Sequence, residues 1–82
     1  MWYAYILESE TDGKHYIGST NDLKRRLCEH EEGRVDATLP RRPLRLVSYI
    51  GVETEAQARS REKFLKTGSG FAFLKKRIFQ SP

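Results

Sequence analysis

One stretch decides the fold of this chain, and its sequence is Tyr16-Ile17-Gly18-Ser19-Thr20-Asn21-Asp22-Leu23-Lys24-Arg25-Arg26-Leu27-Cys28-Glu29-His30. A short run that is typical of a β-strand stops at Gly18, and a helical pattern begins a few residues later. Asn21 or Thr20 can cap that helix by accepting a backbone hydrogen bond. Asp22 suits the positive end of the helix dipole. The stretch therefore predicts a strand that leads directly into a helix.

The predicted helix carries two kinds of residue on one side. Leu23, Arg26, Leu27 and His30 share that side, because residues three and four apart are neighbours on a helix. The leucines are typical of a stripe that faces the core. The arginine and the histidine either reach past the edge of the core to water or line a site at the junction of strand and helix.

The bulk composition limits the architecture and the partners. At 82 residues the chain is expected to form one domain, residues 1–82. Lys and Arg outnumber Asp and Glu by 15 to 11, and the net charge of +4 is compatible with a polyanion such as nucleic acid. The single cysteine, Cys28, excludes an internal disulfide and fits a reducing cytoplasm. Neither a signal peptide nor an apolar run of membrane-spanning length is visible, so we expect a cytoplasmic protein with no membrane contact.

A hairpin is predicted before the deciding stretch. Residues 2–8 are rich in aromatic and β-branched side chains, and both faces of this strand are apolar enough to be covered. Asp12-Gly13 is a strong turn signal, and a second strand follows at 14–18. If these two residues form the turn, Ser9 lies opposite Tyr16, and Tyr5 and Tyr16 point to the same face.

The remaining elements follow in order along the chain. The first helix is expected to end near residue 32, with Gly33 as its C-terminal stop, and residues 44–52 are expected to form a third strand. Thr54-Glu55-Ala56-Gln57 matches a capping box that opens a second helix running to about residue 66. A short last helix is expected at 71–79. The predicted order is β-β-α-β-α-α.

Several polar residues fall on faces that these patterns assign to the core, namely Tyr5, Tyr16, Arg26, His30 and Glu62. One interpretation is structural: Arg26 pairs with Glu62, His30 makes a satisfied hydrogen bond, and the tyrosines pack. The other interpretation is chemical. A carboxylate can hold a divalent cation, an arginine can neutralise a pentacovalent phosphate, and a tyrosine or histidine can deprotonate water. Together the five residues suffice to cut a phosphodiester bond.

The same residues carry a family resemblance. Tyr3-Ala4-Tyr5, followed by Tyr16-Ile17-Gly18, resembles the two-part signature of the GIY-YIG nuclease superfamily. The resemblance continues through Arg26, His30 and Glu62 and covers nearly the whole chain. Within the superfamily, the chain looks most like small standalone bacterial proteins that are similar to the N-terminal domain of the excinuclease that makes the incisions in nucleotide-excision repair.

The resemblance implies a fold and an activity. The implied fold is an α/β (α+β) domain with a three-stranded antiparallel sheet flanked by helices. Glu62 would bind Mg²⁺ or Mn²⁺, Arg26 would contact the scissile phosphate, and Tyr5, Tyr16 or His30 would act as general base. The implied activity is that of a metal-dependent endonuclease, a hydrolase that acts on DNA in preference to RNA, in DNA repair or recombination.

The chain departs from the family pattern in three places. Its first triplet, Tyr3-Ala4-Tyr5, keeps the tyrosine and lacks the glycine. Ser19 stands where some members have a lysine, and the chain has no asparagine downstream of Glu62. Two further hypotheses therefore accompany the nuclease: a nucleic-acid-binding module without catalysis, and an interaction module within a repair complex.

Basic and aromatic residues outside this set are candidates for contacts with nucleic acid. The basic clusters are Lys24 and Arg25, Arg41 and Arg42, and Lys75, Lys76 and Arg77. They are either solvated surface or a surface that follows the phosphate backbone without reading sequence. Tyr3, Trp2 or Tyr49 would stack on a base if exposed, and would otherwise pack in the core. Superfamily members often use a second domain to choose the target, so a protein partner could supply target specificity here.

Overall fold

The computed structural model describes residues 1–67 of the chain. The elements, in chain order, are β1 (Trp2–Ser9), β2 (His15–Thr20), α1 (Leu23–Glu31), the short 3₁₀ helix η1 (Leu39–Arg41), β3 (Leu44–Val52) and α2 (Glu55–Leu65). This order agrees with the prediction as far as it can be compared. The helix expected at 71–79, with Lys75, Lys76 and Arg77, lies outside the described residues. No helix in the described part is long and apolar enough to cross a membrane.

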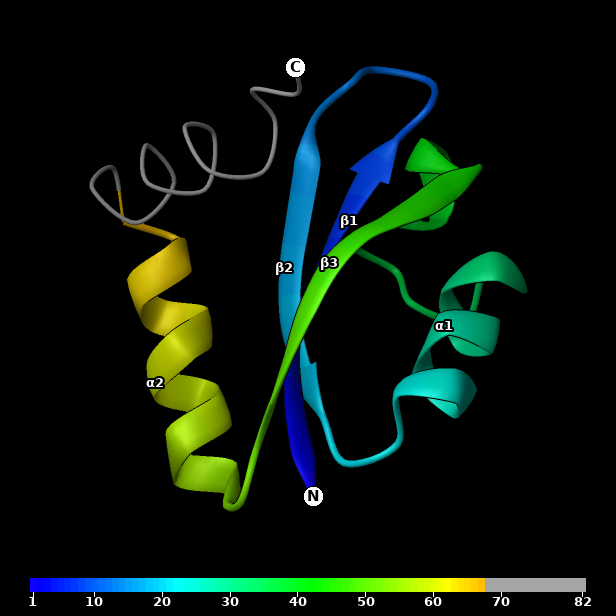
Figure 1. Cartoon of the computed structure of the whole chain (residues 1–82). Coiled ribbons are helices and arrows are strands. Elements are labelled where there is room, and N and C mark those ends of the chain that lie inside the picture. The colour runs from blue at the N-terminus through cyan, green and yellow to red at the C-terminus, as the bar shows by residue number, and fades with distance from the viewer. Residues whose placement is uncertain (68–82) are drawn as a thin grey trace.

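A three-stranded antiparallel sheet in the order β2-β1-β3 forms the centre of the fold. The helices α1 and α2 lie on opposite sides of this sheet (Figure 1). Strand β1 is central, and its residues Ala4, Tyr5, Ile6 and Leu7 are all buried. The first strand is thus covered on both faces, as its apolar composition predicted, and the α+β fold class is confirmed.

The two faces of the sheet have cores of different character. On the side of α2, Ile6, Ile17 and Leu65 form an apolar cluster with Val47 packed against it. On the side of α1, the buried groups include the phenol of Tyr5 and the imidazole of His30. Polar groups that are buried need partners, so the side of α1 is where chemistry is expected.

The hairpin has a different register from the predicted one. Leu7, and not Ser9, lies opposite Tyr16, so the pairing is shifted by two residues along β1. The connection is longer than two residues, because Ser9 N donates to Lys14 O and closes a four-residue loop. Since the side chains of a strand alternate with a period of two, Tyr5 and Tyr16 still share a face.

Helix α1 begins one residue later than predicted and ends as predicted. Asp22 itself is the N-cap, and its Oδ1 accepts a hydrogen bond from Arg25 N at 3.0 Å. The expectation that Asn21 or Thr20 caps the helix was wrong, because Thr20 is still part of β2. Gly33 ends the helix with φ of 79°, a left-handed conformation that glycine adopts without a steric penalty.

Helix α2 starts with the predicted capping box. The Thr54 hydroxyl accepts from Gln57 N at 3.2 Å, and Gln57 Oε1 accepts from Thr54 N at 3.0 Å. These bonds satisfy two backbone donors that the helix itself leaves without partners. The cap fixes the start of the helix that carries Glu62.

Replacing Thr54 with alanine is expected to lower the free energy of unfolding by about 1 kcal/mol, because the Gln57 amide loses its acceptor. Chemical denaturation with urea measures the change. Ser60→Ala, an exposed position within the same helix, is the matched control and should leave stability within about 0.5 kcal/mol of wild type. An equal loss in both variants would contradict the role of the cap.

Candidate active site

The hydroxyl of Tyr5 is the centre of a buried hydrogen-bond network. It lies 2.9 Å from His30 Nε2, and Arg26 Nε donates to it at 3.3 Å. Tyr5 comes from the central strand, and the other two residues come from α1, on the side that the helical pattern predicted. Three of the proposed site residues are therefore in direct contact.

A glycine makes this network possible. Gly18 on β2 lies directly opposite Tyr5 on β1, and the Tyr5 side chain passes over it. A Cβ atom at Gly18 would lie 2.6 Å from the Tyr5 hydroxyl oxygen, which is closer than nonbonded atoms approach. The missing side chain lets the phenol reach across the edge strand β2 toward α1.

His30 is held from both sides of its ring. Its Nδ1 lies 2.8 Å from Thr38 Oγ1, and the Thr38 hydroxyl donates to Val35 O at 3.4 Å. From this bonding pattern we assign the imidazole proton to Nδ1, which leaves Nε2 to accept from the Tyr5 hydroxyl. Thr38 is fully buried in the segment after α1, and no sequence pattern singled it out.

Burial and the neighbouring guanidinium set the protonation states. Burial lowers the pKa of His30 to about 4, and the positive charge of Arg26 acts in the same direction. Burial also raises the pKa of Tyr5, and this outweighs the hydrogen bond from Arg26, which lowers it. The hydrogen bond to Tyr5 is the main cause of a raised pKa for Arg26. At neutral pH the site therefore holds a neutral imidazole, a neutral phenol at Tyr5 and one guanidinium charge.

Tyr16 lies beside this network without joining it. Its ring centroid is 5.1 Å from that of His30 and 6.4 Å from that of Tyr5. The side chain is half-buried, and its hydroxyl makes no hydrogen bond to any other residue in the described part of the chain. Tyr16 is thus the signature tyrosine whose hydroxyl is left for another partner.

Glu62 approaches from the opposite side of the sheet. Ser19 Oγ donates to its Oε1 at 2.8 Å, and Lys66 Nζ lies 2.6 Å from its Oε2. Burial acts to raise the pKa of this carboxyl group, but the bonds from Lys66 and Ser19 outweigh it and the pKa is lowered. Glu62 is therefore ionised at neutral pH. Together with Arg59 and Lys63, these three residues line an open pocket of about 470 Å³.

The predicted structural pairing of Arg26 with Glu62 is not formed. Arg26 Nη1 instead donates to Glu29 on its own helix at 3.2 Å. The two helices lie on opposite sides of the sheet, so each charge takes a partner on its own side. The structural interpretation of the five residues was wrong for this pair.

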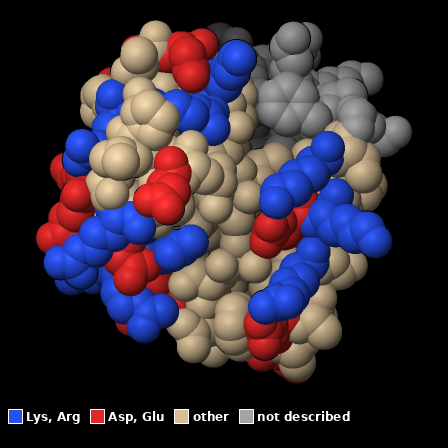
Figure 2. Space-filling model, turned by 180° about the vertical axis from the view of Figure 1, so that it is seen from behind, with Lys and Arg blue, Asp and Glu red and all other residues tan. Residues whose placement is uncertain are grey.

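The outer edge of β2 links the two halves of the site. Gly18 faces α1 beneath the Tyr5 hydroxyl, and the next residue, Ser19, faces α2 and holds Glu62. The charge of Glu62 is close enough to contribute to the raised pKa of Tyr5. Figure 2 shows the molecule from behind, where an uncharged band separates two areas of mixed charge, one of them over α2. A phosphate at this strand edge could contact groups from both helices.

The basic residues that are candidates for contacts with nucleic acid differ in exposure and in the bonds they already make within the protein. Lys24 and Arg25 are exposed on α1. Arg42 is used within the protein, since its Nη1 donates to Glu31 O at 2.8 Å near the end of α1. Arg41 Nε lies 3.5 Å from Asp12 Oδ2, and its side chain is mostly buried. The first cluster is therefore the better candidate of the two that the structure describes.

Replacing Gly18 with alanine is expected to lower the free energy of unfolding by about 1–3 kcal/mol, because the new methyl group overpacks the buried Tyr5 phenol. Gly51→Ala on β3 is the matched control. A Cβ there meets the Met1 sulfur at 2.9 Å, but Met1 is 73% exposed and can move away. Urea denaturation of both variants measures the difference. A Gly18 variant as stable as the Gly51 variant would show that Tyr5 is not tightly held.

Acidification is expected to destabilise the fold through His30. Its pKa is about 4 when folded, against an ordinary 6.5, so between these values the unfolded chain binds more protons. Stability from this group is complete above pH 6.5 and is lost as the pH falls toward 4, by up to ~3 kcal/mol. Urea denaturation across this range measures the slope. His30→Gln, which keeps His15 and every carboxylate, should show a shallower slope, and an unchanged slope would exclude His30 as the cause.

Comparison with known proteins agrees with this geometry. The family model described as the GIY-YIG catalytic domain matches residues 1–76. A UPF0213 protein of Streptococcus pneumoniae is 40% identical over 65 residues, which cover 78% of this chain and 65% of that protein. A UPF0213 protein of Staphylococcus saprophyticus is 35% identical over 68 residues, covering 82% of each chain.

A third relative, the UPF0213 protein of Cupriavidus pinatubonensis, is 36% identical over 59 residues, which cover 71% of this chain and 64% of that protein. The chain thus spans just under two thirds of the length of the first curated relatives that it matches. No solved structure gave a significant match. The match over residues 1–76 covers both signature triplets, α1 and α2, and this chain therefore belongs to the GIY-YIG catalytic-domain family.

Proposed function

We propose that this protein is a divalent-metal-dependent endonuclease that hydrolyses phosphodiester bonds of DNA. The observation that supports it best is the convergence of Tyr5, Tyr16, Arg26 and His30 on one side of β2, with the Glu62 carboxylate at the same strand edge. Family membership supports nuclease chemistry in general. With this activity the protein would act on DNA in repair or recombination.

Glu62 is the residue that would hold Mg²⁺ or Mn²⁺. The described residues contain no group of three or more His, Cys, Asp or Glu that could hold a metal ion, so Glu62 would be the single protein ligand. One carboxylate is compatible with Mg²⁺, which commonly keeps several waters and binds substrate phosphates. A cation bound there would supply Lewis-acid stabilisation of the charge that develops on phosphate. Lys66, whose side chain is 54% exposed, would have to release the carboxylate and turn toward solvent.

The other residues have separate roles in this proposal. Arg26 uses Nε for Tyr5 and Nη1 for Glu29, which leaves Nη2 to bind the scissile phosphate. Tyr16, whose hydroxyl has no partner among the described residues, would as the phenolate take the proton of the attacking water. Tyr5 and His30 are buried and bonded to each other, so they would position Arg26 beside the phosphate.

The test is cleavage by the purified full chain. Labelled duplex, nicked, flap, branched and single-stranded DNA, with a matched RNA set, are incubated in Mg²⁺, in Mn²⁺ and in EDTA. We expect cuts in DNA that need a divalent cation and that are absent from a Glu62→Gln preparation, which controls for a contaminating nuclease. No cleavage by folded protein on any of these substrates would overturn the proposal.

A nucleic-acid-binding module without catalysis is the second candidate. It is favoured by the 2.6 Å contact of Lys66 with Glu62, which occupies the carboxylate that a metal would need. It would show salt-sensitive DNA binding that Glu62→Gln leaves unchanged, with no cleavage in either cation. The substrate series described above separates the two functions.

A further inference from the structure

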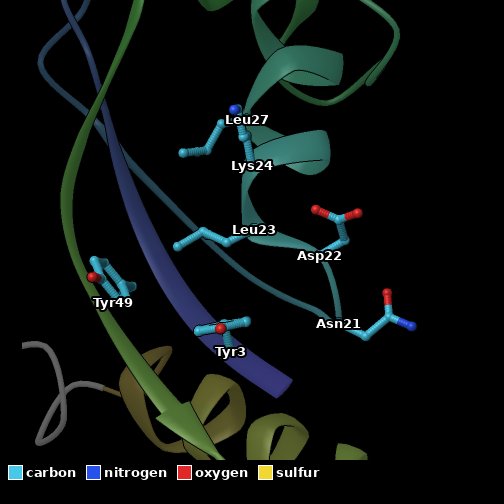
Figure 3. A pocket seen from close by; sticks show the side chains of 7 residues that line it. All are labelled: Tyr3, Asn21, Asp22, Leu23, Lys24, Leu27 and Tyr49. Carbon is cyan, nitrogen blue, oxygen red and sulfur yellow. The ribbon is translucent and has the colours of Figure 1, made fainter. Parts of the chain in front are cut away.

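An open groove of about 440 Å³ lies between α1 and the sheet, on the same face of the sheet as Tyr5. We call it the tyrosine groove, and its lining residues are Tyr3, Asn21, Asp22, Leu23, Lys24, Leu27 and Tyr49. Figure 3 shows the leucine side chains pointing from α1 toward the two tyrosines of the strands, with Asn21 and Asp22 near the start of the helix. The groove is apolar and aromatic inside and polar at one end.

The groove exists because the tyrosines of β1 lean in opposite directions. Tyr5 leans over Gly18 toward β2, whereas Tyr3 contacts Tyr49 of β3, with ring centroids 6.1 Å apart in an edge-to-face arrangement. The groove lies on the Tyr3–Tyr49 side of β1, beside Leu23 and Leu27 of α1. Leu23 and Leu27 are only half-buried there, although their spacing predicts a core stripe.

Tyr49 connects this groove to the site. It is the direct partner of Tyr5 across the β1–β3 pair, so both side chains leave the same face of the sheet. Tyr3 lies two residues before Tyr5, a separation of about 6.6 Å along a strand. Arg26 and Leu27 are adjacent in α1. Consecutive residues of a helix point in different directions, so the Arg26 guanidinium and the groove lie on different flanks of α1 over the same face of the sheet.

The lining fits one flat aromatic ring that stacks on an exposed tyrosine. Tyr49 is 54% exposed, so its ring is available for stacking. The Asn21 and Asp22 side chains point away from the tyrosines (Figure 3), and both accept hydrogen bonds from Arg25, so the ring would be held by stacking and not by polar contacts to its edge. Lys24 adds a positive charge for the sugar–phosphate backbone. A base in a duplex has both faces stacked already, so the ring must come from an unpaired nucleotide.

We propose that the tyrosine groove binds one unpaired nucleobase by stacking on Tyr49, on the same face of the sheet as the proposed active site. That the bound DNA is a substrate rests on the proposed function, whereas the stacking does not. The inference makes unpaired DNA, such as a flap, bulge or single strand, the preferred substrate class. A continuous duplex would leave the groove empty.

Binding is tested with the full chain in EDTA, so that the outcome does not depend on cleavage. The probe is a hairpin with a single bulged 2-aminopurine, whose fluorescence is quenched by stacking, and a continuous duplex is the comparison. Tyr49→Ala and Tyr49→Leu are expected to weaken binding of the bulged hairpin about tenfold and to remove the quenching. Tyr49→Phe keeps the ring and should bind like wild type. Phe64→Ala removes a similarly exposed ring on α2 and is the matched control.

Each outcome decides the inference. The inference is supported if Tyr49→Ala and Tyr49→Leu both lose quenching and affinity for the bulged hairpin. Both variants must bind the continuous duplex like wild type and keep its melting temperature. Unchanged quenching in Tyr49→Ala, or an equal loss in Tyr49→Phe, overturns the inference. A concentration-dependent dimer that Tyr49→Asp dissociates, with no quenching in any variant, would assign the groove to a second copy of the chain and also overturn it. If quenching is seen but no DNA is cut, the proposed nuclease function fails while the groove assignment stands.

Discussion

Replacing Glu62 with glutamine is expected to lower the rate of metal-dependent cleavage by at least about a thousandfold, a loss of ~4 kcal/mol of transition-state stabilisation. Glutamine has nearly the same shape and keeps an oxygen for the hydrogen bond from Ser19. It removes the negative charge that would hold the cation. The change in stability should stay below about 1 kcal/mol, because the ion pair that is lost, the i,i+4 contact with Lys66, lies at the surface.

The same helix offers a matched control for this experiment. Glu55 also pairs with a basic residue four positions later, with Arg59 Nη2 at 2.7 Å from its Oε2. Glu55→Gln therefore removes an equivalent charge and an equivalent ion pair at a carboxylate that does not line the Glu62 pocket, although its partner Arg59 does. Initial rates are measured over a range of Mn²⁺ concentrations for wild type and both variants. Activity of Glu62→Gln at the level of Glu55→Gln would show that Glu62 does not hold a catalytic cation.

The hairpin shows how far local sequence signals determine the register. The Asp12-Gly13 signal correctly predicted a turn, but the loop is wider because two side chains bind the backbone inside it. Ser9 Oγ accepts from the amides of Thr11 and Asp12, and Asp12 Oδ1 accepts from Lys14 N. Such bonds between side chains and nearby backbone compete with a tight two-residue turn. The common face of Tyr5 and Tyr16 was predicted correctly because a shift of two residues preserves it.

The site itself was predictable only where residues lie on the same element or the same strand pair. Helical spacing placed Arg26 and His30 together, and alternation placed Tyr5 with Tyr16. Ser19 and Thr38 were missed as partners, because their contacts join different segments of the chain. Lys66 was also missed, although its i,i+4 spacing from Glu62 on the predicted second helix was a signal for that ion pair. One feature of the sequence did point to Ser19: it stands at a position where some members of the superfamily have a lysine. Here it holds Glu62, so a hydroxyl takes the place of a charge.

Helix α1 shows a second limit of pattern reading. Its periodicity identified the side that faces the sheet, but not how closely each part of that side approaches it. His30 is buried near the end of the helix, whereas the two leucines before it are half-exposed. The direction in which Tyr3 and Tyr5 lean decides this difference, and Gly18 contributes through the side chain that it lacks. Neither effect can be derived from a helical wheel.

Substitution by phenylalanine is expected to have different effects at the two signature tyrosines, on cleavage at Tyr16 and on stability at Tyr5. Tyr16→Phe should lower cleavage by about 10²–10⁴-fold, the usual contribution of a general base, with an unchanged melting temperature. Its hydroxyl makes no hydrogen bond within the described part of the chain, so no structural contact is lost there. Tyr5→Phe should lower the free energy of unfolding by about 1–3 kcal/mol, because the buried His30 Nε2 loses its partner.

Comparing the cleavage rate with the free energy of unfolding for each variant distinguishes a catalytic role of the tyrosine from a structural one. Single-turnover cleavage and urea denaturation are measured for both variants, with cleavage assayed where each protein is fully folded. Tyr5 is entirely buried and bonded to both Arg26 and His30, so an attacking water reaches its oxygen only if that network opens. Tyr16 requires no such opening. If Tyr16→Phe keeps wild-type activity in folded protein, Tyr16 is not the proton acceptor, and a loss in Tyr5→Phe then reports either proton transfer by Tyr5 or the position of Arg26, to which its hydroxyl is bonded.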